Sequence, residues 1–145
     1  MLANRLVDGL YVEAMVLADE VRSYFDAAGR DARDDLDPMT RVLFSCESLK
    51  VTTRLMHVIA WLLTQRAVEV GEIPALAARS PSRRLTGAVE TDAATLARLP
   101  AEAQRFVTAS IDLYRRVALL DAGSDDQPIP TSPVRGLMHR LQQAF

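Results

Sequence analysis

The stretch PMTRVLFSCESLKVTTRLMHVIAWLLTQRAVEV, residues 38–70, decides the fold class of this chain. It is predicted to form one unbroken helix of 33 residues, roughly 50 Å long at about 1.5 Å per residue. Asp37 suits the N-cap, Pro38 suits the first helical position, and Gly71 suits the residue just past the end. We therefore expect one long helix around which the rest of an all-α chain is arranged.

This helix is apolar on two opposite sides. On one side, residues follow one another at alternating spacings of four and three, which is a heptad pattern. This heptad seam alternates a column of large side chains with a column of small ones, and it consists of Val42, Cys46, Leu49, Thr53, Met56, Ala60, Leu63, Ala67 and Val70. A second stripe lies on nearly the opposite side at 100° per residue and consists of Phe44, Val51, Leu55, Val58 and Leu62. A helix with two apolar sides must be covered twice.

The other helix signals predict an antiparallel three-helix bundle. A first helix is expected from about residue 4 to residue 28, with Gly29 ending it, and a third main helix from about residue 100 to residue 121, with Gly123 as its stop signal. Residues 29–37 are acidic but lack the spacing of an EF-hand calcium loop, so a short solvated connection is expected there. The bundle domain is expected to span residues 1–122, and residues 123–145 are expected to form a tail.

An extended linker, residues 71–92, is expected to travel back along the long helix. It contains Gly and Pro and has no sustained period, apart from a helical turn around Ala75–Arg79. Thr91 or Asp92 is expected to cap a short helix that ends near residue 98. Three clustered basic residues precede it, namely Arg79, Arg83 and Arg84. Because no aromatic residues lie between them, a solvated loop is favoured over a phosphate or nucleic-acid site.

Composition and charge bound the class of protein. The chain of 145 residues is 49% hydrophobic and 25% charged, which is ordinary for one globular domain. Its net charge of −2 favours neither nucleic acid nor an anionic membrane as a partner. The one cysteine, Cys46, excludes a disulfide within the chain and is expected to be a small buried residue. With no signal peptide and no run of 18 apolar residues, we expect a cytoplasmic protein with no membrane span.

Residue chemistry argues against an enzyme. The sequence lacks HExxH, CxxC, a Gly-rich phosphate loop and G-x-S-x-G, so we expect no catalytic residues, no metal and no cofactor. His57 invites comparison with histidine phosphotransfer domains, which place a Lys three residues after the His. Here Ala60 holds that position and Trp61 follows it, which disfavours phosphotransfer. Phosphotransfer and nucleic-acid association remain the alternatives to a protein-binding module.

Two protein-binding surfaces are predicted. In a three-helix domain each helix usually shows one side to its partners, so part of the second stripe is expected to meet a second copy or another protein. If so, Leu55→Asp should dissolve a dimer and spare the fold. The tail closes with apolar residues at helical spacing, and the possible docking residues are Leu137, Met138, Leu141 and Phe145. Whether this segment docks on its own domain or on a partner is left open at this point.

Two segments resemble the RcdA-like family, named for the regulator of CtrA degradation. They are LYVEAMVLADEVRSYFD, residues 10–26, and SCESLKVTTRLMHVIAWLLTQRAVEVGE, residues 45–72; ASIDLYRRVALLD, residues 109–121, fits less distinctively. The resemblance implies a three-helix bundle, commonly dimeric, that acts as a non-enzymatic adaptor in cell-cycle proteolysis. It also implies three protein partners: the ClpXP protease machinery, a response-regulator adaptor and transcription-regulator cargo. It carries over no catalytic residue and no cofactor.

Overall fold

The computed structural model is all-α and describes residues 2–85, 87 and 89–124. Six α-helices and one 3-10 helix make up this part of the chain, and no strand occurs in it. The helices are α1 (Leu2–Asp26), α2 (Ala28–Asp34), α3 (Pro38–Glu69), α4 (Ala75–Ala78), η1 (Pro81–Arg83), α5 (Ala93–Arg98) and α6 (Ala101–Ser124). The predicted fold class is therefore confirmed, and the long helix is 32 residues rather than 33.

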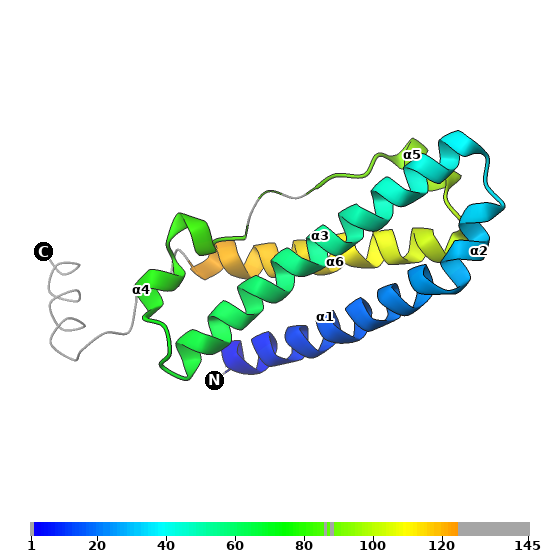
Figure 1. Ribbon diagram of the computed structural model, residues 1–145. Helices are drawn as coiled ribbons and strands as arrows, with labels where there is room; N and C mark the ends of the chain where they lie inside the picture. The colour runs from blue at the N-terminus through cyan, green and yellow to red at the C-terminus, as the bar shows by residue number, and fades with distance from the viewer. Residues whose placement is uncertain (1, 86, 88, 125–145) are drawn as a thin grey trace, which may run out of the picture.

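Three long helices, α1, α3 and α6, form the bundle (Figure 1). Contacts between α1 and α3 pair early residues with late ones, as in the ion pair of Asp8 with Arg66 at 3.4 Å, so these helices are antiparallel. Contacts between α3 and α6 run in the same order along both helices: Arg54 bonds Ser110, and Trp61 bonds Asp121. Helices α3 and α6 therefore point in the same direction, and α1 runs antiparallel to both.

The signals that predicted both ends of α3 are seen in the structure. The Asp37 carboxylate accepts a hydrogen bond from the Thr40 amide at 3.2 Å, as an N-cap side chain does. Hydrogen bonds from Thr40 lower the pKa of Asp37, which keeps this carboxylate charged at the positive end of the helix. Gly71 has φ +81°, the left-handed conformation that favours glycine just beyond a helix end.

The acidic connection between the first two long helices contains a helix of its own, and the expected loop at residues 29–37 is wrong in this respect. Helix α2 (Ala28–Asp34) follows a break at Ala27. Gly29 is buried in its first turn, where an added Cβ would lie 2.8 Å from the Tyr24 carbonyl oxygen. Gly29 thus permits close approach of α2 to the end of α1, because any larger residue would push the two turns apart.

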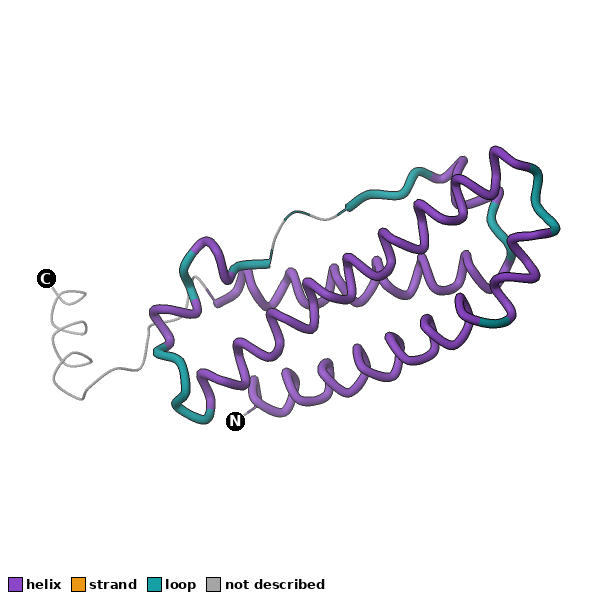
Figure 2. The backbone as a smooth tube through the Cα atoms, in the orientation of Figure 1, coloured by secondary structure: helices purple, strands orange, loops and turns teal. Residues whose placement is uncertain are grey.

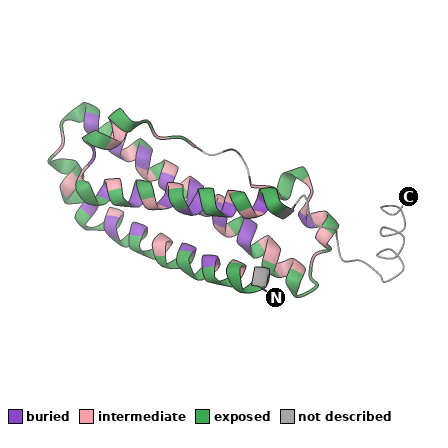
Figure 3. Cartoon of the chain, turned by 180° about the vertical axis from the view of Figure 1, so that it is seen from behind, coloured by how far each residue is buried: buried purple, intermediate pink, exposed green. Residues whose placement is uncertain are grey.

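Only one apolar side of α3 faces the bundle core. The second stripe is buried there, with exposed fractions of 0–4% for Phe44, Val51, Leu55, Val58 and Leu62. These side chains pack with apolar residues of α1 and α6 in one continuous core (Figure 3). The expectation that part of this stripe lies at a surface is therefore wrong: all five residues are core within a single chain. The heptad seam faces outward, and Cys46, expected to be buried, is exposed.

The linker returns along the bundle, as expected. Because α3 and α6 point the same way, the chain must travel the length of the bundle between them, and Figure 2 shows this path from α4 to α5. Asp92 caps α5 by accepting a hydrogen bond from the Thr95 amide at 2.7 Å. Helix α6 continues through Gly123 to Ser124, so this glycine does not stop the helix. The tail residues 125–145 lie outside the described part of the chain.

A matched pair of leucines on α6 tests this assignment of inside and outside. Leu113 is fully buried, whereas Leu119 on the same helix is 69% exposed. Leu113→Ala should lower the free energy of unfolding by about 2–5 kcal/mol, since it removes packed atoms and leaves a cavity. Leu119→Ala should change it by less than about 0.5 kcal/mol. Urea unfolding followed by circular dichroism measures both, and equal losses would contradict the core described above.

Candidate protein–protein interface

The heptad seam is an exposed apolar surface along the whole outer side of α3. Its large side chains are 47–69% exposed and comprise Val42, Leu49, Met56, Leu63 and Val70. In its small column, Cys46 and Ala60 are exposed, and Thr53 and Ala67 are half-buried. Exposed apolar residues elsewhere on α1 and α6 belong to no such repeat along the described chain. A continuous apolar row of this length is the usual mark of an interaction surface.

The opposite side of α3 carries two charged residues inside the core stripe. Glu47 and Arg54 are 3% and 1% exposed. With Val51 and Val58 they follow the spacing four, three, four, which places all four on one side of the helix. Buried charges need partners, and here the partners come from the linker and α6. These charges therefore help to decide which side of α3 faces inward.

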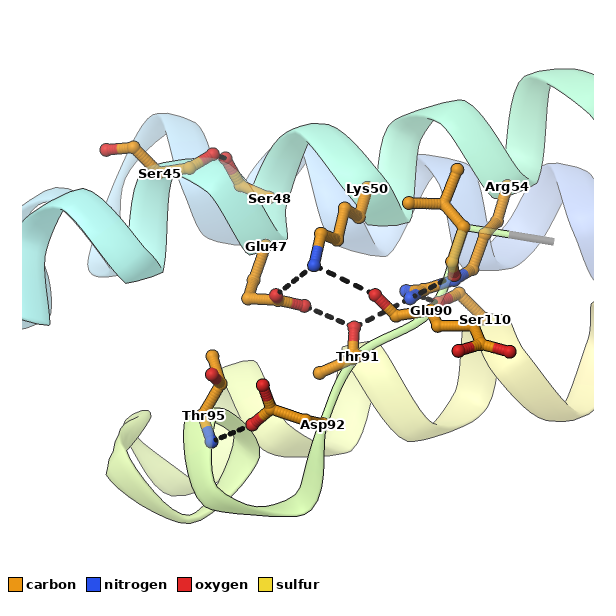
Figure 4. Close-up of polar contacts among 11 residues, drawn as sticks. Ser45, Glu47, Ser48, Lys50, Arg54, Glu90, Thr91, Asp92, Thr95 and Ser110 are labelled. Atoms are coloured by element: carbon orange, nitrogen blue, oxygen red, sulfur yellow. Dashed lines mark hydrogen bonds and ion pairs between the residues drawn. The ribbon is translucent and has the colours of Figure 1, made fainter.

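Arg54 anchors the linker to the bundle (Figure 4). Its Nε and Nη2 atoms donate to the Val89 carbonyl oxygen at 3.0 and 2.8 Å. Nη2 also donates to the Thr91 hydroxyl at 2.7 Å, and Nη1 donates to the Ser110 hydroxyl on α6 at 3.2 Å. Burial lowers the pKa of the Arg54 guanidinium, and the Glu47 carboxylate opposes that shift. One side chain thus joins α3, the linker and α6.

Glu47 and Lys50 complete this anchor. The Thr91 hydroxyl donates to the Glu47 carboxylate, and Lys50 Nζ lies 2.9 Å from the same carboxylate. Lys50 also donates to the Glu90 carbonyl oxygen at 2.8 Å. Figure 4 shows these side chains converging on the linker segment that leads into α5. The linker end is therefore held by charge-assisted hydrogen bonds rather than by apolar packing alone.

A second anchor fixes the linker near the other end of the bundle. Asp121 of α6 is 7% exposed and accepts hydrogen bonds from Trp61 Nε1 at 3.0 Å, Arg84 Nε at 2.8 Å and the Leu85 amide at 3.2 Å. Arg84 is thus engaged within the chain and does not join Arg79 and Arg83 in one free basic patch. The two anchors hold the linker on the core side of α3, which leaves the heptad seam uncovered.

The remaining features of the described chain do not assemble a catalytic site. A hollow of about 420 Å³ lies between the linker and α6, with Arg54, Thr91, Ile111 and Tyr114 in its lining. The Arg54 donors are already bonded to protein groups there. Across the described residues, no three His, Cys, Asp or Glu side chains are grouped as metal ligands would be. Nor does any described helix have the length and apolar content to cross a membrane.

The structure therefore relocates the predicted binding residues. The second stripe is core, and the exposed surface is the heptad seam on the other side of the same helix. The predicted tail docking residues, Leu137, Met138, Leu141 and Phe145, lie outside the described part of the chain. Residue chemistry missed the two linker anchors. A signal was present, since Glu47 and Arg54 lie at core spacing between buried valines.

Comparison with known proteins gives one family and one solved structure. The model of the family described as "Protein of unknown function (DUF1465)" matches residues 1–145. The crystal structure of RcdA from Caulobacter crescentus CB15 is similar, with 37% sequence identity and a TM-score of 0.68. The match covers 82% of this chain and 90% of that chain. No curated protein matches this sequence. The resemblance to RcdA seen in the sequence is therefore confirmed by a shared fold.

The Arg54 anchor can be tested by removing its charge. Arg54→Met should lower the free energy of unfolding by about 3–5 kcal/mol, because Glu47 stays buried with one cation fewer. It should also speed hydrogen exchange at the amides of residues 89–91. The control is Arg22→Met, whose ion pair with Asp19 is mostly exposed and should be worth less than about 1 kcal/mol. Equal effects of the two substitutions would show that Arg54 is no anchor.

Proposed function

We propose that this chain, which belongs to the family described as "Protein of unknown function (DUF1465)", is a non-enzymatic helical adaptor that brings proteins together. The observation that carries the proposal is the heptad seam, five large apolar side chains in regular register along the exposed side of α3. A surface that binds other proteins needs such a row, whereas an enzyme needs converging reactive groups. The likeness to RcdA supports the same class of function.

We propose that a second copy of the chain covers the heptad seam. Heptad spacing is the period at which the side chains of two helices interdigitate along their length. In a two-fold contact the same surface meets itself, so each large column can lie along the small column of the other copy. The small residues at Cys46, Thr53, Ala60 and Ala67 leave room for close approach of the two helices. The partner for this surface is therefore a homodimer mate.

The biological role follows from the family resemblance. We propose that the dimer works in the cytoplasm in regulated, cell-cycle proteolysis and helps to deliver transcription regulators to the ClpXP protease. A response-regulator adaptor would act with it, as the RcdA-like resemblance implies. An adaptor of this kind raises the local concentration of cargo at the protease without making or breaking bonds, so no cofactor and no catalytic residue are needed.

The alternative functions gain no support from the site. For phosphotransfer, the position four residues after His57 is Trp61, which is buried and donates to Asp121. For nucleic-acid binding, Arg84 of the linker is paired with Asp121 at 2.8 Å, and the net charge is −2. Neither alternative uses the most extensive exposed feature of α3. We therefore do not pursue them.

The dimer proposal predicts the effect of one charge in the middle of the seam. Met56→Asp should convert a species near 32 kDa, twice the 16.0 kDa chain, into one near 16 kDa, because it places a carboxylate in a buried apolar contact. Its circular dichroism should stay native, since Met56 is 64% exposed in the monomer. Light scattering over a concentration series measures the mass, with Leu119→Asp on α6 as the control that should remain dimeric. A wild-type chain that stays at 16 kDa throughout would refute the dimer.

The adaptor role is tested by reconstituted proteolysis. ClpXP, the response-regulator adaptor and a transcription regulator of the CtrA type would be combined with the wild-type chain or with Leu119→Asp. Both chains should accelerate loss of the transcription regulator, while a reaction without the chain should stay slow. If the chain leaves the rate unchanged while it still forms a dimer, the seam serves self-association and the role in proteolysis is wrong.

A further inference from the structure

The C-terminal half of the heptad seam lies close to the point where the described chain ends. Trp61 of α3 donates to Asp121 of α6 at 3.0 Å, and α6 ends three residues later at Ser124. Figure 1 shows the ends of α3 and α6 at the same end of the bundle. On the outer side of α3, this part of the seam includes Leu63, 47% exposed, and Val70, 69% exposed. Residues 125–145 therefore start beside an uncovered apolar surface.

The sequence after Ser124 has two parts. Residues 134–145 place apolar side chains on one side of a helix, because Val134, Leu137, Met138, Leu141 and Phe145 follow helical spacing. A helix of 12 residues is marginal in water by itself, so this segment needs an apolar surface to be stable as a helix. At about 1.5 Å per residue it would be about 18 Å long and would match roughly 12 residues of α3. That length corresponds to the seam from Met56 to Val70.

The intervening segment is long enough to reach that surface. Residues 125–133 number nine and span at most about 30 Å when extended. A path from the end of α6 around α3, whose diameter with side chains is about 10–12 Å, fits within that length. Three prolines, Pro128, Pro130 and Pro133, keep this segment from continuing α6. The distal segment would therefore meet the seam as a separate element.

Charge also matches the two surfaces. The C-terminal end of α3 carries the negative end of the helix dipole and is followed closely by two exposed acids, Glu69 and Glu72. The distal tail segment is basic on its polar side, with Arg135 and Arg140. One cation on α3, Arg66, also lies near this end, and it is paired with Asp8 at 3.4 Å. The approach of a basic helix is therefore favourable at this end of the seam.

We propose that residues 134–145 dock as an amphipathic helix on their own chain's seam between Met56 and Val70, and that this docking competes with the dimer. The proposal rests on the proposed function only in taking a second copy as the competitor for the seam. Docking within one chain occurs at an effective concentration in the millimolar range, so even a weak helix–groove contact is populated. Each copy must release its tail before the seams can pair, so the tail would set the concentration at which the adaptor assembles.

The first experiment measures dimerisation with an altered tail in the full chain. Leu137→Asp with Leu141→Asp removes the apolar side of the tail and should lower the dimer dissociation constant at least about tenfold. His139→Asp with Gln143→Asp adds the same charge on the polar side and should change it less than about twofold. Sedimentation velocity in roughly 0.5 M salt, where charge effects are screened, gives both constants. An unchanged constant in the first variant would overturn the competition.

The second experiment tests docking without relying on the dimer. Leu63→Asp and Leu49→Asp each place a carboxylate in the seam, but only Leu63 lies in the segment assigned to the tail. Trypsin cleavage after Arg135 and Arg140, followed by mass spectrometry at low protein concentration, should be at least about fivefold faster in Leu63→Asp than in Leu49→Asp. Equal cleavage rates would show that the tail does not dock there. A chain that never dimerises but shows the predicted difference would refute the dimer and retain tail docking.

Discussion

Helix α3 carries apolar side chains on two opposite sides, and α1 and α6 together cover only one of them. The covered side contains aromatic residues, Phe44 and Trp61, which bury large areas, and it contains the Glu47–Arg54 charges that need the linker and α6 as partners. The aliphatic heptad seam is left outside. The arrangement of the linker, the direction of α6 and the exposed surface all follow from this choice of the inner side.

The two linker anchors make that choice specific. Arg54 and Glu47 hold residues 89–91 at one end, and Asp121 holds Arg84 and Leu85 at the other. Because removal of one partner of a buried charge is costly, rotation of α3 to bury the seam instead would break both anchors. The linker is thus the element that allows α3 and α6 to run in the same direction, and its anchors keep the seam available to other chains.

Local signals in the sequence were sufficient for the helices but not for their orientation. The caps at Asp37 and Asp92 and the glycine at residue 71 were predicted because each depends on neighbours within a few residues. Helix α2 was missed because its place depends on the close contact of Gly29 with Tyr24. The wrong side of α3 was chosen as the interface because both sides are apolar, and only tertiary partners of Arg54 and Glu47 distinguish them.

The most direct test of the outward seam is the reactivity of Cys46, the single cysteine of the chain. Its thiol is exposed in the monomer and lies in the small column of the seam. The rate of its reaction with a thiol-specific dye should therefore be close to that of a free thiol at low protein concentration, and should fall as rising concentration covers the seam with a second copy. A slow rate at every concentration would mean that Cys46 is buried within one chain, and would contradict the orientation of α3 on which this account depends.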